Sequence, residues 1–158
     1  MALTFIPDPD ATPGQCYHPY PGLRRVLAPN PGPFTYTGTG TYILGTKTLA
    51  VIDPGPNNEG HLSAILKAAD APISHIIVTH THRDHSPLSQ RLKEETGAAI
   101  WGCAPVSQDG HTAQFEEALD DLYRPDHIMS DGERLQGDGW TLEAITTPGH
   151  ISNHLCFH

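Results

Sequence analysis

Six consecutive residues of this chain carry three imidazoles and a carboxylate, a dense set of groups for binding a metal ion. The side chains concerned are His80, His82, Asp84 and His85. Imidazole nitrogen and carboxylate oxygen together suit Zn²⁺, Fe or Mn. The apolar run 76–78 comes shortly before them and predicts a strand, so the ligands would lie in the loop at its end. Because a loop can direct successive side chains to one point, the pattern indicates a metal site rather than scattered surface polar groups.

A further candidate ligand, His150, lies much later in the chain, after another strand-like stretch. The residues that lead into it are Thr147, Pro148 and Gly149. A lone histidine after a strand is more often structural than metal-binding. Proline followed by glycine favours a tight turn that fixes the direction of the next side chain. This lead-in makes His150 a candidate ligand.

The sequence HxHxDH at 80–85, followed by TPGH at 147–150, resembles the metallo-β-lactamase superfamily of metal-dependent hydrolases. The upstream segments similar to its β-lactamase-like endoribonuclease branch are 30–33, 38–42 and 51–55. The resemblance implies an αββα sandwich of two αβ halves, with the site in the cleft between the sheet edges. The second half of that fold supplies a bridging aspartate and a final histidine. We therefore expect this chain to correspond to the N-terminal half.

The resemblance also implies a role for each candidate residue. His80, His82 and His150 would hold a first metal ion, and Asp84 and His85 would belong to a second. Two Zn²⁺ ions are expected in a complete site, with Fe or Mn as alternatives. The nucleophile would be a metal-bound hydroxide, since a metal ion lowers the pKa of bound water to about 7. Asp84 is also the candidate catalytic residue, because it could steer that hydroxide or pass a proton to the leaving group.

Two interpretations of Asp53 stay open. It ends the strand-like stretch 48–52 and precedes Pro54 and Gly55. It could accept a hydrogen bond from a ligand histidine and so fix the orientation of the ring. It could equally be an aspartate that only forms the turn before proline.

The sequence departs from the common superfamily pattern DHxGG at 86–88, where it has Ser-Pro-Leu. This change leaves the metal ligands intact, but it puts in doubt any substrate inferred from the common pattern. Ser86 is predicted to cap a helix that has Pro87 at its first position. The remaining histidines are expected to be surface or packing residues. His154 lies four residues after His150, but the strand expected there argues against a helical pair of ligands. Cys156 is expected to be buried.

Composition limits the functions that the chain can have. At 158 residues it is long enough for one domain with a sizeable core. A formal net charge of −9 argues against general nucleic-acid binding, which depends on a basic surface. Three cysteines predict no disulfide framework and a reducing compartment. The sequence shows no signal peptide and no membrane span, so the cytoplasm is expected.

Residues 1–35 are rich in proline and predict an N-terminal arm, either an extended lid or a floppy terminus. Residues 36–158 are predicted to form the αβ half itself, in the α/β class, with a mixed β-sheet and flanking helices. The predicted helices span 59–69, 87–96 and 111–122. Asn57 or Asn58 is expected to cap the first helix, whose apolar stripe is Leu62, Ile65, Leu66 and Ala69. In the third helix Leu122 is expected to face inward. The predicted strands span 35–44, 48–53, 74–79, 98–102, 127–129 and 153–157. A hairpin is predicted from 134–135 and 140–146, which flank the glycine turn 137–139.

Three functions are consistent with this pattern. We expect a metal-dependent hydrolase of a small ester, thioester, lactone or amide. An endoribonuclease or phosphodiesterase acting on single-stranded RNA is the alternative that the branch resemblance suggests, and the acidic composition ranks it second. A truncated, non-catalytic metal-binding fragment is the third, and its open sheet edges could favour a homo-oligomer.

Overall fold

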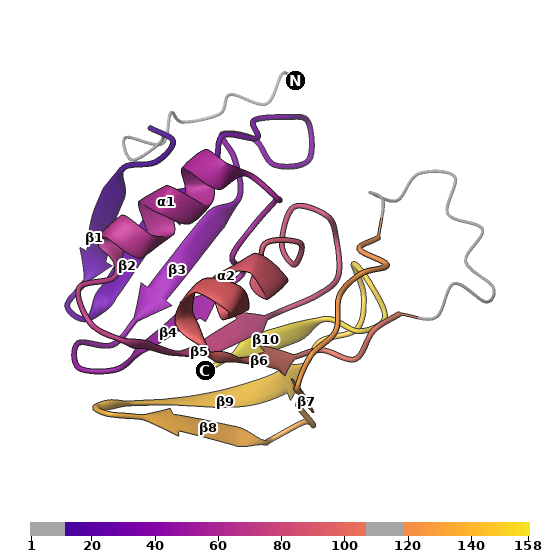
Figure 1. Cartoon of the computed structure of the whole chain (residues 1–158). Helices are drawn as coiled ribbons and strands as arrows, with labels where there is room; N and C mark the ends of the chain where they lie inside the picture. Colours follow the sequence, from indigo (N-terminus) through magenta and orange to yellow (C-terminus); the bar gives the residue numbers. More distant parts are fainter. Residues whose placement is uncertain (1–11, 107–118) are drawn as a thin grey trace, which may run out of the picture.

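The computed structural model describes residues 12–106 and 119–158. Within these residues the chain forms a seven-stranded sheet, a three-stranded sheet and two helices, arranged in layers (Figure 1). Both helices cover one face of the larger sheet, and the smaller sheet lies on the opposite face. The expected α/β fold with a mixed sheet and flanking helices is confirmed, and the chain also contributes strands to a second sheet.

The larger sheet changes from antiparallel to parallel pairing at its middle. Its strands, in spatial as well as chain order, are β1 (Cys16–Tyr20), β2 (Leu23–Leu27), β3 (Gly40–Leu44), β4 (Leu49–Ile52), β5 (Ile73–Val78), β6 (Ala99–Gly102) and β7 (His127–Ile128). Pairing is antiparallel from β1 to β4 and parallel from β4 to β7. Parallel strands end at the same edge of a sheet, so the segments that follow β4, β5 and β6 meet there.

Helix α1 (Glu59–Ala68) confirms the helix predicted over 59–69. Asn58 caps it, because its side-chain oxygen accepts a hydrogen bond from the backbone N–H of His61 at 2.9 Å. Helix α2 (Ser89–Thr96) ends at Gly97, whose φ of 73° is the left-handed conformation that favours glycine.

The predicted cap of α2 is wrong. The helix begins at Ser89, and the residue before it is Leu88, which has no polar side-chain atom to donate or accept. The hydroxyl of Ser86 donates instead to a carboxylate oxygen of Asp120 at 2.7 Å. This partner is remote in sequence, so the local pattern of Ser86 and Pro87 did not reveal it.

The smaller sheet comprises β8 (Arg134–Gly137), β9 (Trp140–Thr146) and β10 (Leu155–Phe157), with β9 in the middle. Antiparallel pairing of β8 with β9 confirms the predicted hairpin. The backbone N–H of Leu155 donates to the carbonyl of Thr79 at 2.9 Å. This bond joins the smaller sheet to the end of β5, where the candidate ligand loop begins.

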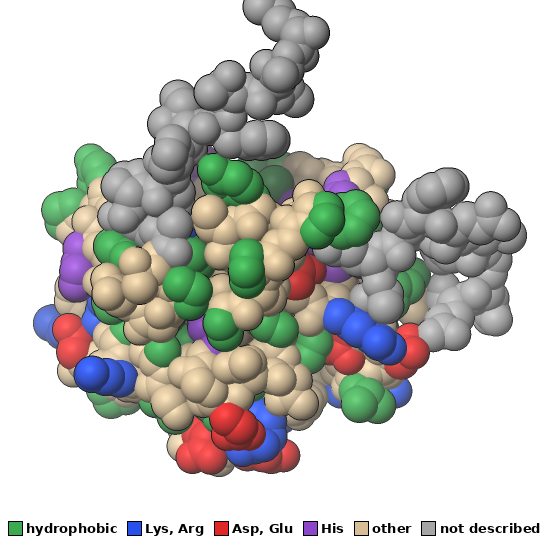
Figure 2. Space-filling model, turned by 90° about the horizontal axis from the view of Figure 1, so that it is seen from above, with side chains coloured by type: hydrophobic (Ala, Val, Ile, Leu, Met, Phe, Trp, Pro, Cys, Tyr) green, Lys and Arg blue, Asp and Glu red, His purple; other side chains and the backbone are tan. Residues whose placement is uncertain are grey.

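The surface carries charges of both signs. On the face in Figure 2, Lys and Arg side chains lie beside Asp and Glu side chains. One such pair, Arg91 with Glu59 at 2.8 Å, links α2 to α1. Exposed pairs of this kind contribute about 0–1 kcal/mol each, so they are minor contributors to stability.

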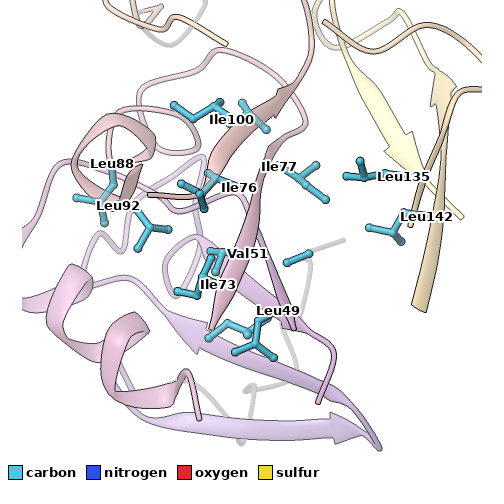
Figure 3. Packing of buried hydrophobic residues seen from close by; sticks show 14 of the residues in the cluster. Leu49, Val51, Ile73, Ile76, Ile77, Leu88, Leu92, Ile100, Leu135 and Leu142 are labelled. Carbon is cyan, nitrogen blue, oxygen red and sulfur yellow. The ribbon is translucent and has the colours of Figure 1, made fainter. Parts of the chain in front are cut away.

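The core continues through β5 from one layer to the next. Side chains alternate along a strand, so Ile76 points toward Leu88 and Leu92 on the helix side, whereas Ile77 points toward Leu135 and Leu142 of the smaller sheet (Figure 3). Both isoleucines are fully buried. Full burial of such a side chain contributes about 1.5–3 kcal/mol, and together the two hold all three layers around the strand that carries the ligand loop.

The predicted N-terminal arm is wrong for residues 16–27. Strands β1 and β2 occupy this stretch, and β2 pairs along its whole length with β3. Proline is tolerated in edge strands, where its missing N–H breaks no ladder. Pro19 lies in the edge strand β1, and Pro21 lies in the turn that follows it. The prolines therefore did not exclude a sheet.

Two side chains that were predicted to be buried are exposed. The helix expected over 111–122 lies mostly outside the described residues, but Leu122, expected to face inward, is 79% exposed. Cys156, expected to be buried, is also exposed. It lies on β10 between Leu155 and Phe157, so strand alternation turns its side chain away from the buried face of Leu155.

Candidate metal centre

Three imidazoles converge where β5 ends. Nε2 of His80 lies 3.1 Å from Nδ1 of His82, and Nε2 of His150 lies 3.1 Å from the same atom of His82. One ligand atom from each ring can be chosen so that all three lie within 4.8 Å of one another. His80 and His82 are buried, whereas His150 is exposed. The three-histidine group thus presents nitrogen lone pairs to one point from two segments far apart in the sequence.

The loop that carries His150 is hydrogen-bonded to the ligand loop by the side chain of Asn153. The amide nitrogen of Asn153 donates to the hydroxyl of Thr81 at 3.2 Å and to the carbonyl of Ala104 at 2.7 Å. Within the same loop, the hydroxyl of Thr147 lies 2.8 Å from Nδ1 of His154. These bonds hold the turn between β9 and β10 against the end of β5, and so bring His150 to the other two rings.

Burial keeps His80 neutral. Desolvation, reinforced by the neighbouring imidazoles, lowers the pKa of His80 to about 2. A histidine must be neutral to bind a metal ion. His80 is therefore in its ligand form at every physiological pH.

A second group, the His85 triad, is formed by Asp53, His85 and Asp84. Nδ1 of His85 lies 2.9 Å from Oδ2 of Asp53, and its Nε2 lies 3.1 Å from Oδ2 of Asp84. Burial alone would lower the pKa of His85, but its hydrogen bonds and charge interactions with both carboxylates outweigh burial and raise the pKa to about 10. The ring is therefore a doubly protonated imidazolium in the metal-free protein.

Asp84 is held by two donors on one oxygen. The hydroxyl of Thr39 donates to its Oδ2 at 2.7 Å, on the same oxygen that faces His85. Burial favours the neutral acid, but the hydrogen bonds from His85 and Thr39 and the charge of His85 hold the pKa of Asp84 well below its usual range. Oδ1 is buried and has no hydrogen-bond partner among the described residues. Asp84 thus offers one oxygen to a cation or a proton.

Asp53 accepts three hydrogen bonds through its side chain. They come from the backbone N–H and the hydroxyl of Thr79, both at 2.8 Å, and from Nδ1 of His85. Its φ is 48°, the left-handed region, which costs an L-residue roughly 1–2 kcal/mol. Two interpretations of Asp53 were left open above. Its contact with Nδ1 of His85 corresponds to the first, a carboxylate that accepts a hydrogen bond from a candidate ligand ring and orients it.

These residues fit a divalent metal ion. Converging nitrogens, one of them on a ring held neutral, together with a buried and unpartnered carboxylate oxygen, form the donor set that such ions prefer. The structure brings His80, His82 and His150 together as one group, and Asp84 and His85 as an adjacent one.

Sequence reasoning missed three side chains at the centre. The ring of His154 lies 4.9 Å from that of His80, centroid to centroid, although it was expected to be a packing or surface residue. The hydroxyl of Thr39 donates to Asp84, and His61 is linked through the hydroxyl of Thr41 to the carbonyl of Asp53. The position of His154 four residues after His150 was a signal, but the expected strand argued against a helical pair. No local pattern pointed to Thr39 or His61.

Comparison with known proteins identifies the family. Residues 36–158 match the family model of the Metallo-beta-lactamase superfamily. The chain belongs to this superfamily. The resemblance of the motifs at 80–85 and 147–150 is thereby confirmed.

Its relatives in the superfamily include proteins with different names. The chain is 32% identical over 141 residues to a beta-lactamase-like protein 2 homolog from Caenorhabditis elegans, covering 84% of this chain and 44% of that protein. It is 33% identical over 144 residues to an atrochrysone carboxyl ACP thioesterase from Cryptosporiopsis sp., covering 87% and 39%. The chain therefore spans less than half the length of these curated relatives.

A solved structure confirms the fold. The metallo-β-lactamase MIM-1 from Novosphingobium pentaromativorans superposes with a TM-score of 0.72 at 20% identity, over 93% of this chain and 56% of that one. Among the helices that the structure describes, none is long and apolar enough to cross a membrane.

Proposed function

We propose that this superfamily chain provides the metal-binding half of a hydrolase that acts on a small ester or thioester. The observation that carries the proposal is the convergence of His80, His82 and His150. These three residues would hold a metal ion, which would supply a water-derived nucleophile near neutral pH without a serine or cysteine. The name thioesterase, carried by the relative from Cryptosporiopsis sp., supports the thioester among the substrates considered.

We infer that the metal is Zn²⁺, because imidazole dominates the donor set. The three-histidine group would hold one ion, and Asp84 with His85 would hold a second. Fe and Mn are the alternatives that elemental analysis distinguishes. Asp84 is the proposed catalytic residue: Thr39 and His85 occupy its Oδ2, so Oδ1 is the oxygen available to accept a proton and pass it to the leaving group.

The acidic charge of the chain supports the proposal of a small substrate over RNA. The net charge is −9, and among the described residues on the face in Figure 2 no continuous basic patch is visible. Recognition of a nucleic-acid backbone depends on such a patch.

The cysteines bear on the compartment. Cys16, Cys103 and Cys156 are free thiols, which supports a reducing compartment such as the cytoplasm.

The test combines metal content with hydrolysis. Protein purified without added metal would be analysed for zinc per chain, then assayed on an acyl thioester, a lactone, a β-lactam and a single-stranded RNA, with and without a chelator. Hydrolysis of the thioester that the chelator abolishes and zinc restores would support the proposal. Cleavage of RNA alone would replace it with the endoribonuclease, and one zinc or fewer with no hydrolysis would favour the non-catalytic fragment. Gel filtration of the same sample would test for a homo-oligomer.

A further inference from the structure

A buried histidine outside the metal centre, His61, is connected by hydrogen bonds to Asp53 of the His85 triad. His61 lies on α1 and is 1% exposed. Its Nε2 is 2.8 Å from the hydroxyl of Thr41 on β3, and that hydroxyl is 2.7 Å from the backbone carbonyl of Asp53. Thr41 is fully buried. The contacts run from the helix layer, through the larger sheet, to the turn that carries Asp53.

The direction of each hydrogen bond in this series is fixed. A threonine hydroxyl has one hydrogen, and a carbonyl oxygen can only accept, so Thr41 donates to Asp53. The same hydroxyl must then accept from His61, which places the ring hydrogen on Nε2. Nδ1 of His61 is left as a buried acceptor with no hydrogen-bond partner among the described residues. Leucine or phenylalanine would fill this place without an unsatisfied atom, so packing alone does not account for the imidazole.

Asp53 needs this support because its backbone is strained and its side chain is fully engaged. Its φ is 48°, and its backbone N–H continues the ladder by donating to the carbonyl of Ile77 at 2.8 Å. Thr41 fixes the carbonyl on the other side of the residue. The ring of His61 also lies against the following turn: a Cβ added at Gly55 would meet Nε2 of His61 at 3.0 Å. The His61 ring therefore packs against the turn at residues 53–55.

We propose that His61 and Thr41 are positioning residues of the metal centre, which fix the backbone of Asp53 and, through its carboxylate, the ring of His85. The inference rests on the proposed function only in taking His85 as a metal ligand. Orientation of the His85 ring by this route is a property of the metal-free protein and can be measured there.

The first test follows the ring N–H protons of His85 by nuclear magnetic resonance in metal-free protein. Thr41→Val keeps the shape of the side chain but removes its hydroxyl, whereas Thr41→Ser retains the hydroxyl. We expect the Nδ1–H signal of His85 to be lost or shifted in Thr41→Val and restored in Thr41→Ser. Ile65→Val, a cavity-forming change on α1, the helix that carries His61, is the matched control and should leave the signal in place. An unchanged signal in a folded Thr41→Val variant would overturn the proposal.

A pair of variants at His61 covers the case in which Thr41→Val does not fold. His61→Phe retains a ring but loses the donor, and His61→Gln retains a donor N–H. The proposal predicts loss of the His85 signal in the first and its retention in the second. Equal signals in the two variants would contradict it.

The second readout is Zn²⁺ affinity measured by calorimetry. We expect Thr41→Val to weaken the second equivalent of Zn²⁺ about ten-fold, the lower end of the effect of residues that orient ligands, with the first equivalent unchanged. Equal weakening of both equivalents would indicate a merely structural role and would count against the proposal. If wild-type protein bound no Zn²⁺, the proposed function would fail, and the resonance experiment would still decide the role of His61 and Thr41.

Discussion

The two groups at the metal centre differ in what already occupies them. In the three-histidine group, imidazole nitrogens face one another, and burial keeps His80 neutral. In the His85 triad, the imidazole lies between two carboxylates and carries an extra proton. The first group is arranged for a metal ion, whereas the second is arranged for a proton that a metal ion must displace. The two groups should therefore respond differently to substitution and to pH.

Removal of His82 should break the first group. His82→Ala takes away the ring whose Nδ1 lies 3.1 Å from both other imidazoles, so most of the zinc at the first position should be lost, roughly a hundred-fold or more in affinity. Elemental analysis of the purified variant measures this directly. His18→Ala, on an exposed residue of β1, is the control. Unchanged zinc content in His82→Ala would exclude His82 as a ligand.

The His85 triad should stabilise the metal-free protein in a pH-dependent way. The pKa of His85 is raised in the folded state, so its contribution is complete below the unfolded value of about 6.5 and is lost as pH rises through about 10. His85→Gln should thus reduce the free energy of unfolding by a few kcal/mol near pH 6, and by much less above pH 10. Urea denaturation at both pH values measures the difference. A penalty that is independent of pH would show that His85 is not charged in the folded protein.

The pH dependence of zinc binding sharpens the same comparison. Because the second ion must displace the proton of His85, its affinity should rise about ten-fold per pH unit between about pH 6 and pH 8.5. The first equivalent should show a shallower slope, since His80 has no proton to lose in that range. Calorimetric titration at several pH values separates the two equivalents. Equal pH dependence of zinc affinity for the two equivalents would contradict the difference in protonation between the three-histidine group and the His85 triad.

The smallest expected effect, that of Ser86→Ala, tests whether Ser86 belongs to the His85 triad. Ser86 follows His85, is fully buried and donates to Asp120, so Ser86→Ala should cost about 1 kcal/mol of stability and leave zinc affinity unchanged. Comparison with Asp120→Asn and the double variant would isolate the bond between the two side chains. A change in zinc affinity in Ser86→Ala would extend the second group to this residue.

Local patterns were sufficient to predict the elements that a short segment determines. The apolar stripe and asparagine cap predicted α1, and the glycine turn at 137–139 predicted the hairpin of β8 and β9. Both motifs that carry the candidate ligands were visible in the sequence, because their residues lie close together along the chain. Convergence of the two motifs was expected only from the family resemblance.

The features that were missed depend on distant partners. Strand β2 is internal only because β1 lies outside it, and Pro19 lies in β1, which a linear pattern does not reveal. The hydroxyl of Ser86 is taken by a residue 34 positions away, and Thr39 reaches Asp84 across 45 positions. Such contacts depend on tertiary structure, so neither helix propensity nor motif spacing could have predicted them.

The separation of His82 from His150 has a consequence for how the protein is made. The two rings are 68 residues apart in the sequence, and α2, β6, β7, β8 and β9 lie between them. A ribosome adds about 5–20 residues per second, so His80 and His82 are synthesised several seconds before the third ring. Closing a loop of this length must await the pairing of distant strands. Binding of the proposed first metal ion by all three rings would therefore be a late step in biogenesis, and an ion bound there would report that both sheets have assembled.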